Sequence, residues 1–431
     1  MRRERFRNWA GTVEAAPRQW LRPIDERELS EQIARAAAAG QRVKAVGSGH
    51  SWNDIAAGDD VLVSVDRLAR LEQVDRERGT ILVGAGLKLR HLNDQIAALD
   101  LALPIVGSIA EQTLAGVVST ATHGSSLRHG NLSSLVVGVR LVDGEGRLHR
   151  IDERDPRLPA VRVGLGALGI LTAIELRVER GFRLTETVEA MRFDHACARL
   201  VEIARSAEYV KLWWLPSSRR LLVYRHERTN RPANVGRRAR WIEQRLMHDV
   251  LFEALLRLGG RFPPLVAPVG RLVTEAFARV RPRTDRADRA LRVPMPPVHR
   301  ETEYSVALER GAELLEGTRR LIERLRLRVD FPVEVRFGPA DDAWLSPSYG
   351  RDSCHVGAYM ARAPGAQAYF DGFEELARSL EGRPHWGKEH RAEPTVLRKI
   401  YPRFDDWVAV RRQLDPHGRF RNAWLDRTVG T

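Results

Sequence analysis

Along the first 180 residues, apolar and polar positions alternate with two different spacings. Short apolar runs bounded by glycine or polar residues predict strands, whereas apolar residues spaced three and four apart predict helices. Strands are predicted at residues 42–46, 61–65, 80–86, 135–142 and 169–178. Helices are predicted at residues 26–39 and around Leu89, Leu92 and Ile96. This alternation indicates one domain of the size that holds a nucleotide.

The pattern changes near residue 181. From there to about residue 400, strand-like runs such as residues 210–214 alternate with basic helices such as residues 237–255. Residues 279–298 are rich in arginine and proline and are predicted to form an exposed connection. The expected fold class is α+β, with a first domain at residues 1–180, a second at 181–400 and a C-terminal segment at 401–431 that returns to the first.

The composition is that of an ordinary globular protein, with 43% hydrophobic and 29% charged residues. A chain of 431 residues is longer than one core requires, so two or three packed units are expected. The two cysteines, Cys197 and Cys354, provide no disulfide framework, which suits a reducing compartment. No apolar stretch is long enough to span a membrane, and the basic N-terminus lacks the apolar run of a secretory signal. We therefore expect a cytoplasmic protein without a membrane span.

The net charge is +14, from 70 lysine and arginine residues against 56 acidic ones. A basic protein can bind nucleic acid, but these arginines are scattered and interleaved with acids, as in residues 283–289. This pattern favours solvated helix faces, with attraction for anionic substrates or membrane surfaces as the lesser alternative. We expect no nucleic-acid partner.

The first candidate motif is Gly-Ser-Gly-His-Ser at residues 47–51, directly after a predicted strand. Consecutive small residues let the backbone adopt left-handed angles, so that successive N–H groups can converge on a phosphate. Trp52 stands where the dinucleotide-binding pattern needs its third glycine, which disfavours a mobile NAD cofactor. An ordinary tight turn is the alternative, and His50 beside the glycines favours a cofactor.

A second segment, residues 107–126, is dense in serine, threonine and glycine around the apolar residues Leu114 and Val117. Small hydroxyl residues offer hydrogen-bond donors and let a flat ring approach the main chain.

A third motif places Glu334 and Arg336 on one face of a strand, because side chains alternate at period two. Such a pair is either a surface ion pair or a binding site for a polyhydroxyl ligand.

A fourth motif, residues 383–390, surrounds Lys388 with tryptophan, glycine and two histidines, which is unlike a solvated lysine. His385 and His390 raise the question of a metal ion, but no carboxylate or cysteine pattern near them supports zinc. We therefore expect no metal.

These motifs, taken in order, resemble those of the sugar-lactone and alditol oxidases of the vanillyl-alcohol-oxidase-type FAD superfamily, and most of all its D-arabinono- and L-gulono-1,4-lactone oxidases. The resemblance covers nearly the whole chain. It rests on Gly-Ser-Gly-His-Ser, Gly-Ser-Ile-x-Glu-Gln-x-x-Ala-Gly from residue 107, Thr-His-Gly-Ser from residue 122, His-Trp-Gly-Lys from residue 385, and the Asp-Pro-x-Gly-x-Phe-x-Asn ending from residue 415.

The resemblance implies a two-lobed FAD-binding domain of the PCMH type and a cap domain of antiparallel sheet with flanking helices. It implies that His50 is bonded covalently to the flavin 8α carbon, as a neutral imidazole can be. The pyrophosphate and flavin edge would contact Ala45, Val46, Gly47, Ser48, Gly49 and Ser51. The second FAD-contacting segment would supply Ser108, Thr113, Gly116, Thr120, Ala121, Thr122 and His123, and Ile170 would contact the adenine end.

For the substrate, the resemblance implies a sugar lactone or polyol bound by Ser108, Glu334, Arg336 and Lys388. Hydride would pass from the carbinol to flavin N5, with Lys388 near the transfer and Arg336 steadying the alkoxide. Oxygen would then reoxidise the flavin and give hydrogen peroxide, and Gly107 is compatible with oxygen access. His355 would lie near the pocket.

Several alternatives stay open. The Glu334–Arg336 pair and the His-Trp-Gly-Lys motif would equally suit an alditol oxidase acting on xylitol- or sorbitol-like polyols, whereas residues 107–126 favour a lactone oxidase. A dehydrogenase with another electron acceptor is a further alternative. A basic nucleic-acid-binding protein belongs to a different class and would need a binding module that the sequence lacks. A flavin carrier without catalysis is disfavoured by Lys388 and the Glu334–Arg336 pair.

Overall fold

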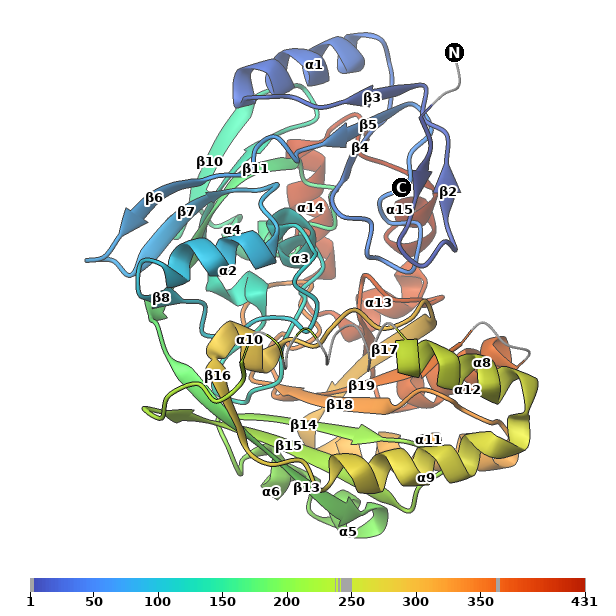
Figure 1. Ribbon diagram of the computed structural model, residues 1–431. Coiled ribbons are helices and arrows are strands. Elements are labelled where there is room, and N and C mark those ends of the chain that lie inside the picture. Colours follow the sequence, from blue (N-terminus) through green and yellow to red (C-terminus); the bar gives the residue numbers. More distant parts are fainter. Residues whose placement is uncertain (1–3, 237, 239–240, 242–249, 362–364, 431) are drawn as a thin grey trace.

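The computed structural model describes residues 4–236, 238, 241, 250–361 and 365–430. The N-terminal part contains a parallel sheet and an antiparallel sheet (Figure 1). The parallel sheet has the order β3-β5-β4, formed by Gln19–Leu21, Val61–Ser64 and Val43–Val46. The antiparallel sheet has the order β10-β9-β11-β7-β6, formed by Leu148–Asp152, Val136–Val142, Ile170–Arg177, Thr80–Gly84 and Leu71–Asp75.

The helices of this part follow the apolar spacing of the sequence. Helix α1 (Glu26–Ala38) begins after Asp25, whose side chain accepts a 2.8 Å hydrogen bond from the Glu28 N–H. Its buried residues Leu29, Ile33 and Ala36 lie on one face. The other helices here are α2 (Leu89–Ala97), α3 (Leu114–Ser119) and α4 (Leu158–Val161).

The second part is built on one eight-stranded antiparallel sheet with the order β16-β13-β15-β14-β18-β19-β17-β20. Its strands are β13 (Arg183–Arg192), β14 (Tyr209–Trp214), β15 (Arg220–Thr229), β16 (Arg283–Arg286), β17 (Arg300–Ala307), β18 (Val333–Gly338), β19 (Ser353–Met360) and β20 (Arg383–Pro384). The packed helices are α5 (Phe193–Ala198), α6 (Leu200–Ala204), α11 (Gly311–Arg324) and α12 (Ala366–Ser379).

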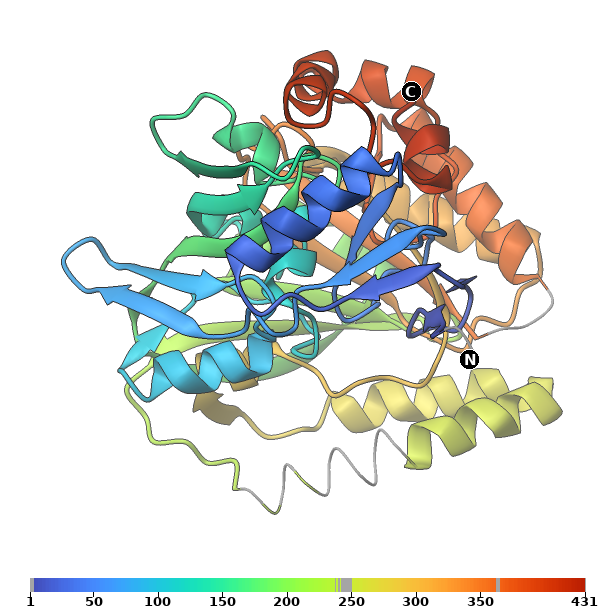
Figure 2. The same ribbon diagram turned by 90° about the horizontal axis from the view of Figure 1, so that it is seen from above.

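Two further helices, α8 (Glu253–Arg261) and α9 (Val266–Phe277), form a hairpin at one side of the molecule (Figure 2). The chain then closes with α13 (Pro394–Ile400), α14 (Phe404–Leu414) and α15 (Ala423–Thr428). Trp407 and Trp424 of this ending share one hydrophobic core with Leu29 and Ile33 of α1. The short strand β12 (Glu179–Arg180) ends at the domain border predicted from the sequence.

The predicted α+β class is confirmed, and so are the predicted strands and helices of the first 180 residues, within one to three residues at their ends. The prediction of an exposed connection at residues 279–298 is wrong. This segment contains β16, which pairs with β13, and α10 (Ala287–Leu291), and its Thr284 and Ala287 are buried. The composition of the segment suggested a loop, and the strand was not recognised because only its four residues pair with β13.

The predicted basic helix at residues 237–255 lies mostly outside the described residues. Among the residues that are described, no helix is long and apolar enough to cross a membrane.

Candidate active site

The turn that follows β4 is packed directly against the second glycine-rich segment. A Cβ atom added to Gly47 would lie 2.2 Å from the Thr113 side-chain oxygen, so a larger residue would have to displace that hydroxyl. Gly49 has a φ of +67°, a left-handed value that favours glycine. The Ser48 hydroxyl donates a 2.8 Å hydrogen bond to the Glu111 carbonyl. The structure therefore brings the two predicted cofactor segments together.

A cavity of about 110 Å³ lies between these segments and β11. Most residues expected to contact FAD line this cofactor cleft, namely Ala45, Val46, Gly47, Ser48, Gly49, His50, Ser51, Thr113, Gly116, Thr120 and Ile170. Three others, Ser108, Thr122 and His123, line the neighbouring cavity. Ala121 is buried with a φ of +53° and lines neither.

The cofactor cleft offers polar groups to a ligand. Thr113 Oγ1 is buried and has no hydrogen-bond partner among the described residues. Lys44, which the sequence did not single out, lines the cleft, and its amine donates to the carbonyls of Leu165, Gly166 and Phe420 over 3.4, 3.0 and 3.4 Å. Burial lowers the pKa of Lys44 to about 7, so a nearby anion would restore its charge. A free hydroxyl among small residues fits a phosphate-bearing cofactor such as FAD.

His50 lines both the cofactor cleft and the larger neighbouring cavity. Burial lowers its pKa to about 4, against the opposing charge of Glu111, so the imidazole is neutral at pH 7. Its ring stacks on Trp9 with 5.9 Å between the centroids. A neutral imidazole nitrogen at this junction can act as a nucleophile toward a cofactor.

The neighbouring cavity, of about 330 Å³, is lined by all four residues expected to bind substrate: Ser108, Glu334, Arg336 and Lys388. We call this the substrate pocket. Arg336 Nη2 donates to Glu334 Oε2 over 2.6 Å and to the Ser108 hydroxyl over 2.7 Å. The prediction that Glu334 and Arg336 share one face of a strand is confirmed by this contact on β18.

Glu334 has further partners that the sequence did not indicate. Trp213 Nε1 donates to its Oε1 and the Tyr359 hydroxyl to its Oε2, each over 2.8 Å. Burial alone would raise the pKa of Glu334, but the charge and hydrogen bond of Arg336 hold it at about 2. Trp213 and Tyr359 come from β14 and β19, and only the pairing of those strands with β18 brings them to the site.

Lys388 forms a close ion pair with Glu301 Oε2 on β17. Its ammonium group also lies 3.9 Å from the centre of the Trp52 ring. The backbone of Lys388 is held by the segment that follows His50, because Asn53 Nδ2 donates to the Lys388 carbonyl over 2.7 Å. The His-Trp-Gly-Lys motif is thus tied to the segment that carries His50.

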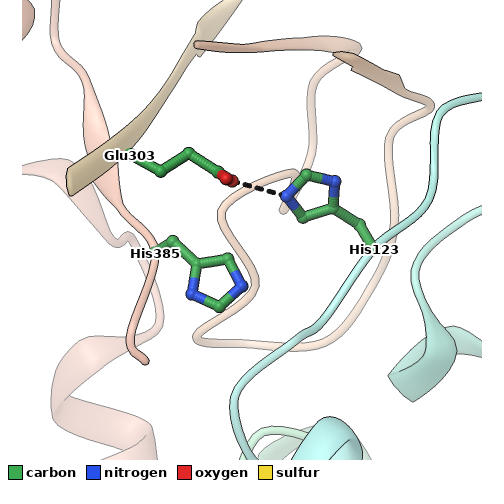
Figure 3. A group of neighbouring side chains, drawn as sticks. All are labelled: His123, Glu303 and His385. Carbon is green, nitrogen blue, oxygen red and sulfur yellow. Dashed lines mark hydrogen bonds and ion pairs between the residues drawn. The ribbon is translucent and has the colours of Figure 1, made fainter. Parts of the chain in front are cut away.

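A buried group of His123, Glu303 and His385 lies at one wall of the substrate pocket (Figure 3). His123 Nε2 and Glu303 Oε1 are 2.6 Å apart. Burial opposes ionisation of Glu303, but the facing His123 holds its pKa well below the usual range. The ligand atoms of the three side chains lie within 4.8 Å of one another, so they could hold a metal ion.

This group corrects the expectation that no carboxylate accompanies His385. Glu303 comes from β17, far from His385 in the sequence, so spacing along the chain could not reveal it. His390 lies elsewhere, with its ring against Trp386 and Trp424. His355 stacks on His123 with 3.9 Å between the ring centroids and lies behind it, outside the pocket lining.

A pocket that can bind and orient an alcohol opens beside a cleft that fits FAD, and this neighbourhood defines a flavin-dependent oxidoreductase. Residues 174–428 match the family model described as D-arabinono-1,4-lactone oxidase, and residues 17–152 match the model of an FAD-binding domain. The chain belongs to the D-arabinono-1,4-lactone oxidase family and carries an FAD-binding domain.

Individual relatives match over nearly the full chain. The chain is 34% identical over 424 residues to an L-gulono-1,4-lactone dehydrogenase of Mycobacterium tuberculosis, covering 98% of each protein. It is 31% identical over 431 residues to the L-gulonolactone oxidase of Scyliorhinus torazame, again covering 98% of each. A D-arabinono-1,4-lactone oxidase of Eremothecium gossypii is 28% identical over 498 residues, covering 96% of this chain and 93% of that one.

Among solved structures, cholesterol oxidase from Brevibacterium sterolicum has the same fold. Its TM-score is 0.81 at 15% sequence identity, covering 98% of this chain and 96% of the other. At this identity the likeness shows the fold alone.

Proposed function

We propose that the protein oxidises the carbinol of an aldono-1,4-lactone of the D-arabinono-, L-gulono- or L-galactono-lactone type. One observation carries the proposal: Ser108, Glu334, Arg336 and Lys388 converge on one pocket that His50 also lines. The similarity to a lactone dehydrogenase and to lactone oxidases supports this substrate class.

FAD, when bound, supplies the acceptor for the hydride that leaves the carbinol carbon. Arg336 is cationic and faces the pocket, so it stabilises negative charge on the substrate oxygen as the hydroxyl proton leaves. Both oxygens of Glu334 already accept hydrogen bonds from the protein. Its role is therefore to hold Arg336 and Tyr359 in position, and the remaining donors of Arg336 and Ser108 orient the lactone.

The ion pair of Lys388 and Glu301 provides the route for the hydroxyl proton. Both side chains line the substrate pocket, and Glu301 is buried. In this proposal Lys388 positions the carbinol oxygen, and Glu301 behind it receives the proton.

We also propose that FAD is bonded covalently to His50. The neutral imidazole and its place at the junction of the cofactor cleft and the substrate pocket support this assignment. The two cysteines are both buried and free, which supports a cytoplasmic location.

Molecular oxygen is the proposed acceptor of the second half-reaction, giving hydrogen peroxide. A dehydrogenase with another acceptor is the second candidate, which the name of the mycobacterial relative favours. The alternative substrate is an alditol, because the four pocket residues would also bind an open-chain polyol.

One experiment separates these candidates. The purified holoprotein is mixed with a panel of aldonolactones and alditols, and oxygen uptake and reduction of a soluble dye are followed in parallel. The proposal expects turnover with lactones, accompanied by oxygen uptake and peroxide. Turnover with alditols alone would refute the lactone assignment, and dye reduction without oxygen uptake would identify a dehydrogenase.

A further inference from the structure

The substrate pocket does not end at its charged residues. Its lining continues along α8 and α9, the hairpin seen at one side of the molecule (Figure 2). The side chains there are Leu255, Leu256, Val266, Val269, Val273 and Phe277. We call this part of the pocket the apolar arm. A lactone or polyol would find no hydrogen-bond partner on these side chains, so the arm suits a different ligand.

One wall of the apolar arm is a regular helical stripe. Val266, Val269, Val273 and Phe277 are spaced three and four residues apart and therefore share one face of α9. Leu272 lies outside this stripe and is 71% exposed. From Val266 to Phe277 the helix rises about 16 Å, which matches an extended chain of about a dozen methylene groups.

A series of aromatic rings connects the apolar arm with His50. The His50 ring stacks on Trp9 at 5.9 Å, and Trp9 lies 5.6 Å from His299. His299 in turn lies 4.9 Å from Phe331, and Phe331 lies 5.2 Å from Phe252 at the start of the arm. Rings at these separations offer faces and edges to a planar conjugated ligand.

We propose that the apolar arm binds the hydrocarbon tail of a quinone, whose ring lies among these aromatic residues and accepts electrons from the cofactor. This assignment rests on the proposed function, with the protein acting as a dehydrogenase whose electron acceptor is not oxygen. The carbinol loses two electrons and two protons and becomes a carbonyl group. The quinone gains two electrons and two protons and becomes a hydroquinone. The charged end of the pocket serves the lactone, and the apolar arm serves the acceptor.

Binding tests the apolar arm directly. Holoprotein is titrated with benzoquinones that share one ring and carry no tail, a five-carbon tail or a ten-carbon tail. Quenching of the protein's tryptophan fluorescence reports Kd, because Trp9, Trp52 and Trp213 line the pocket. A fully buried methylene should tighten binding by about fourfold, so even if most of the tail is only partly buried, the ten-carbon quinone should bind at least about a hundredfold more tightly than the tail-less one. Equal affinities for the three quinones would overturn the proposal.

Two matched pairs of variants locate the tail. Val273→Glu and Leu256→Glu put a carboxylate into the apolar arm, and neither residue is fully buried, so the fold should tolerate both. Leu272→Glu and Ala254→Glu change exposed positions on the same two helices. We expect the first pair to abolish the dependence of Kd on tail length and the second pair to preserve it. Identical behaviour of the two pairs would refute the assignment of the arm.

Turnover separates this inference from the proposed function. With lactone as donor, kcat/KM should rise with quinone tail length in the wild type but not in Val273→Glu, while the exposed variant Leu272→Glu should match the wild type with the quinones and with a small soluble dye. If the dye is reduced but tail length has no effect, the quinone assignment fails and the proposed function stands. If lactone reduces neither dye nor quinone, the proposed function fails, and the redox role of the quinone fails with it.

Discussion

The cofactor cleft and the substrate pocket are neighbours, but they are built by different means. The cleft is made largely of glycine, serine, threonine and alanine from two continuous segments, which pack so closely that a Cβ at Gly47 would collide with Thr113. The charged wall of the pocket is made of long side chains from β14, β17, β18 and β19 together with Lys388. They are held by the Glu334–Arg336 contact within β18, by hydrogen bonds from β14 and β19 to Glu334, and by the ion pair of Lys388 with Glu301 on β17. The cleft depends on shape, and the pocket depends on mutually compensating charges.

The largest expected effect comes from removing a charge on the pocket side. Arg336→Ala should lower kcat/KM for the lactone by about a thousandfold, because a donor to the developing oxyanion is lost. It should also destabilise the fold by about 3 kcal/mol or more, because Glu334 would stay buried without its cation. Steady-state kinetics and urea unfolding measure the two effects.

A double variant separates the two roles of Arg336. Arg336→Ala with Glu334→Gln should recover most of the lost stability, because no buried charge is left, and should recover none of the activity. Arg324→Ala, at an exposed position of the same domain, is the control and should change neither quantity. Recovery of activity in the double variant would show that Arg336 acts only on stability.

The second prediction concerns acid stability. The pKa of Glu334 falls from 4.5 to about 2 on folding. A depressed carboxyl pKa stabilises the fold above pH 4.5, and this contribution is lost as the pH falls from 4.5 toward 2. Its full size is roughly 3 kcal/mol, since one pKa unit corresponds to about 1.4 kcal/mol. The difference in unfolding free energy between wild type and Glu334→Gln should therefore shrink across this pH range. A difference that stays constant from pH 6 to 3 would contradict the assignment.

The third prediction turns to the cofactor side. In His50→Ala the yellow colour should separate from the protein after acid precipitation, whereas it should stay with the wild-type protein. The close-packed cleft should still bind FAD in this variant, so we expect turnover to fall only about tenfold, or 1.4 kcal/mol in barrier. His91→Ala, an exposed histidine nearby, is the control. Colour that stays bound in His50→Ala would refute the covalent link.

The contrast between the two regions also explains how much could be predicted from the sequence. The cofactor segments are local, so their glycine and hydroxyl residues could be recognised by spacing, and the structure places Gly47 against Thr113. Glu334 and Arg336 could be paired because period two places both on one face of a single strand.

The partners of Glu334 and Lys388 could not be predicted in this way. Trp213, Tyr359 and Glu301 reach the site only through the order of strands in the eight-stranded sheet. No periodicity along the chain encodes that order, and the same holds for Glu303 beside His123. Short edge strands such as β16 were missed because four residues give too little pattern.

The fourth prediction tests those partners. Tyr359→Phe and Trp213→Phe each remove one hydrogen bond to the Glu334 carboxylate. A hydrogen bond to a charged group contributes about 1.5–3 kcal/mol to stability, so each variant should lose about that much. The fall in kcat/KM should stay near fivefold, about 1 kcal/mol in barrier, because Arg336 still holds the carboxylate. A loss as large as that of Arg336→Ala would place these residues in direct contact with the substrate.

The smallest effect is expected at Gly107, which directly precedes the pocket residue Ser108. An added Cβ would lie 2.9 Å from the Thr122 methyl carbon, and Gly107 does not line the substrate pocket. Gly107→Ala should therefore strain the packing against Thr122 and leave the pocket open. We expect stopped-flow reoxidation by oxygen to slow by less than about threefold, under 1 kcal/mol in barrier. Thr122→Ser, combined with Gly107→Ala, should relieve the strain. A slowing of tenfold or more, with unchanged reduction by lactone, would instead show that Gly107 controls the access of oxygen to the cofactor.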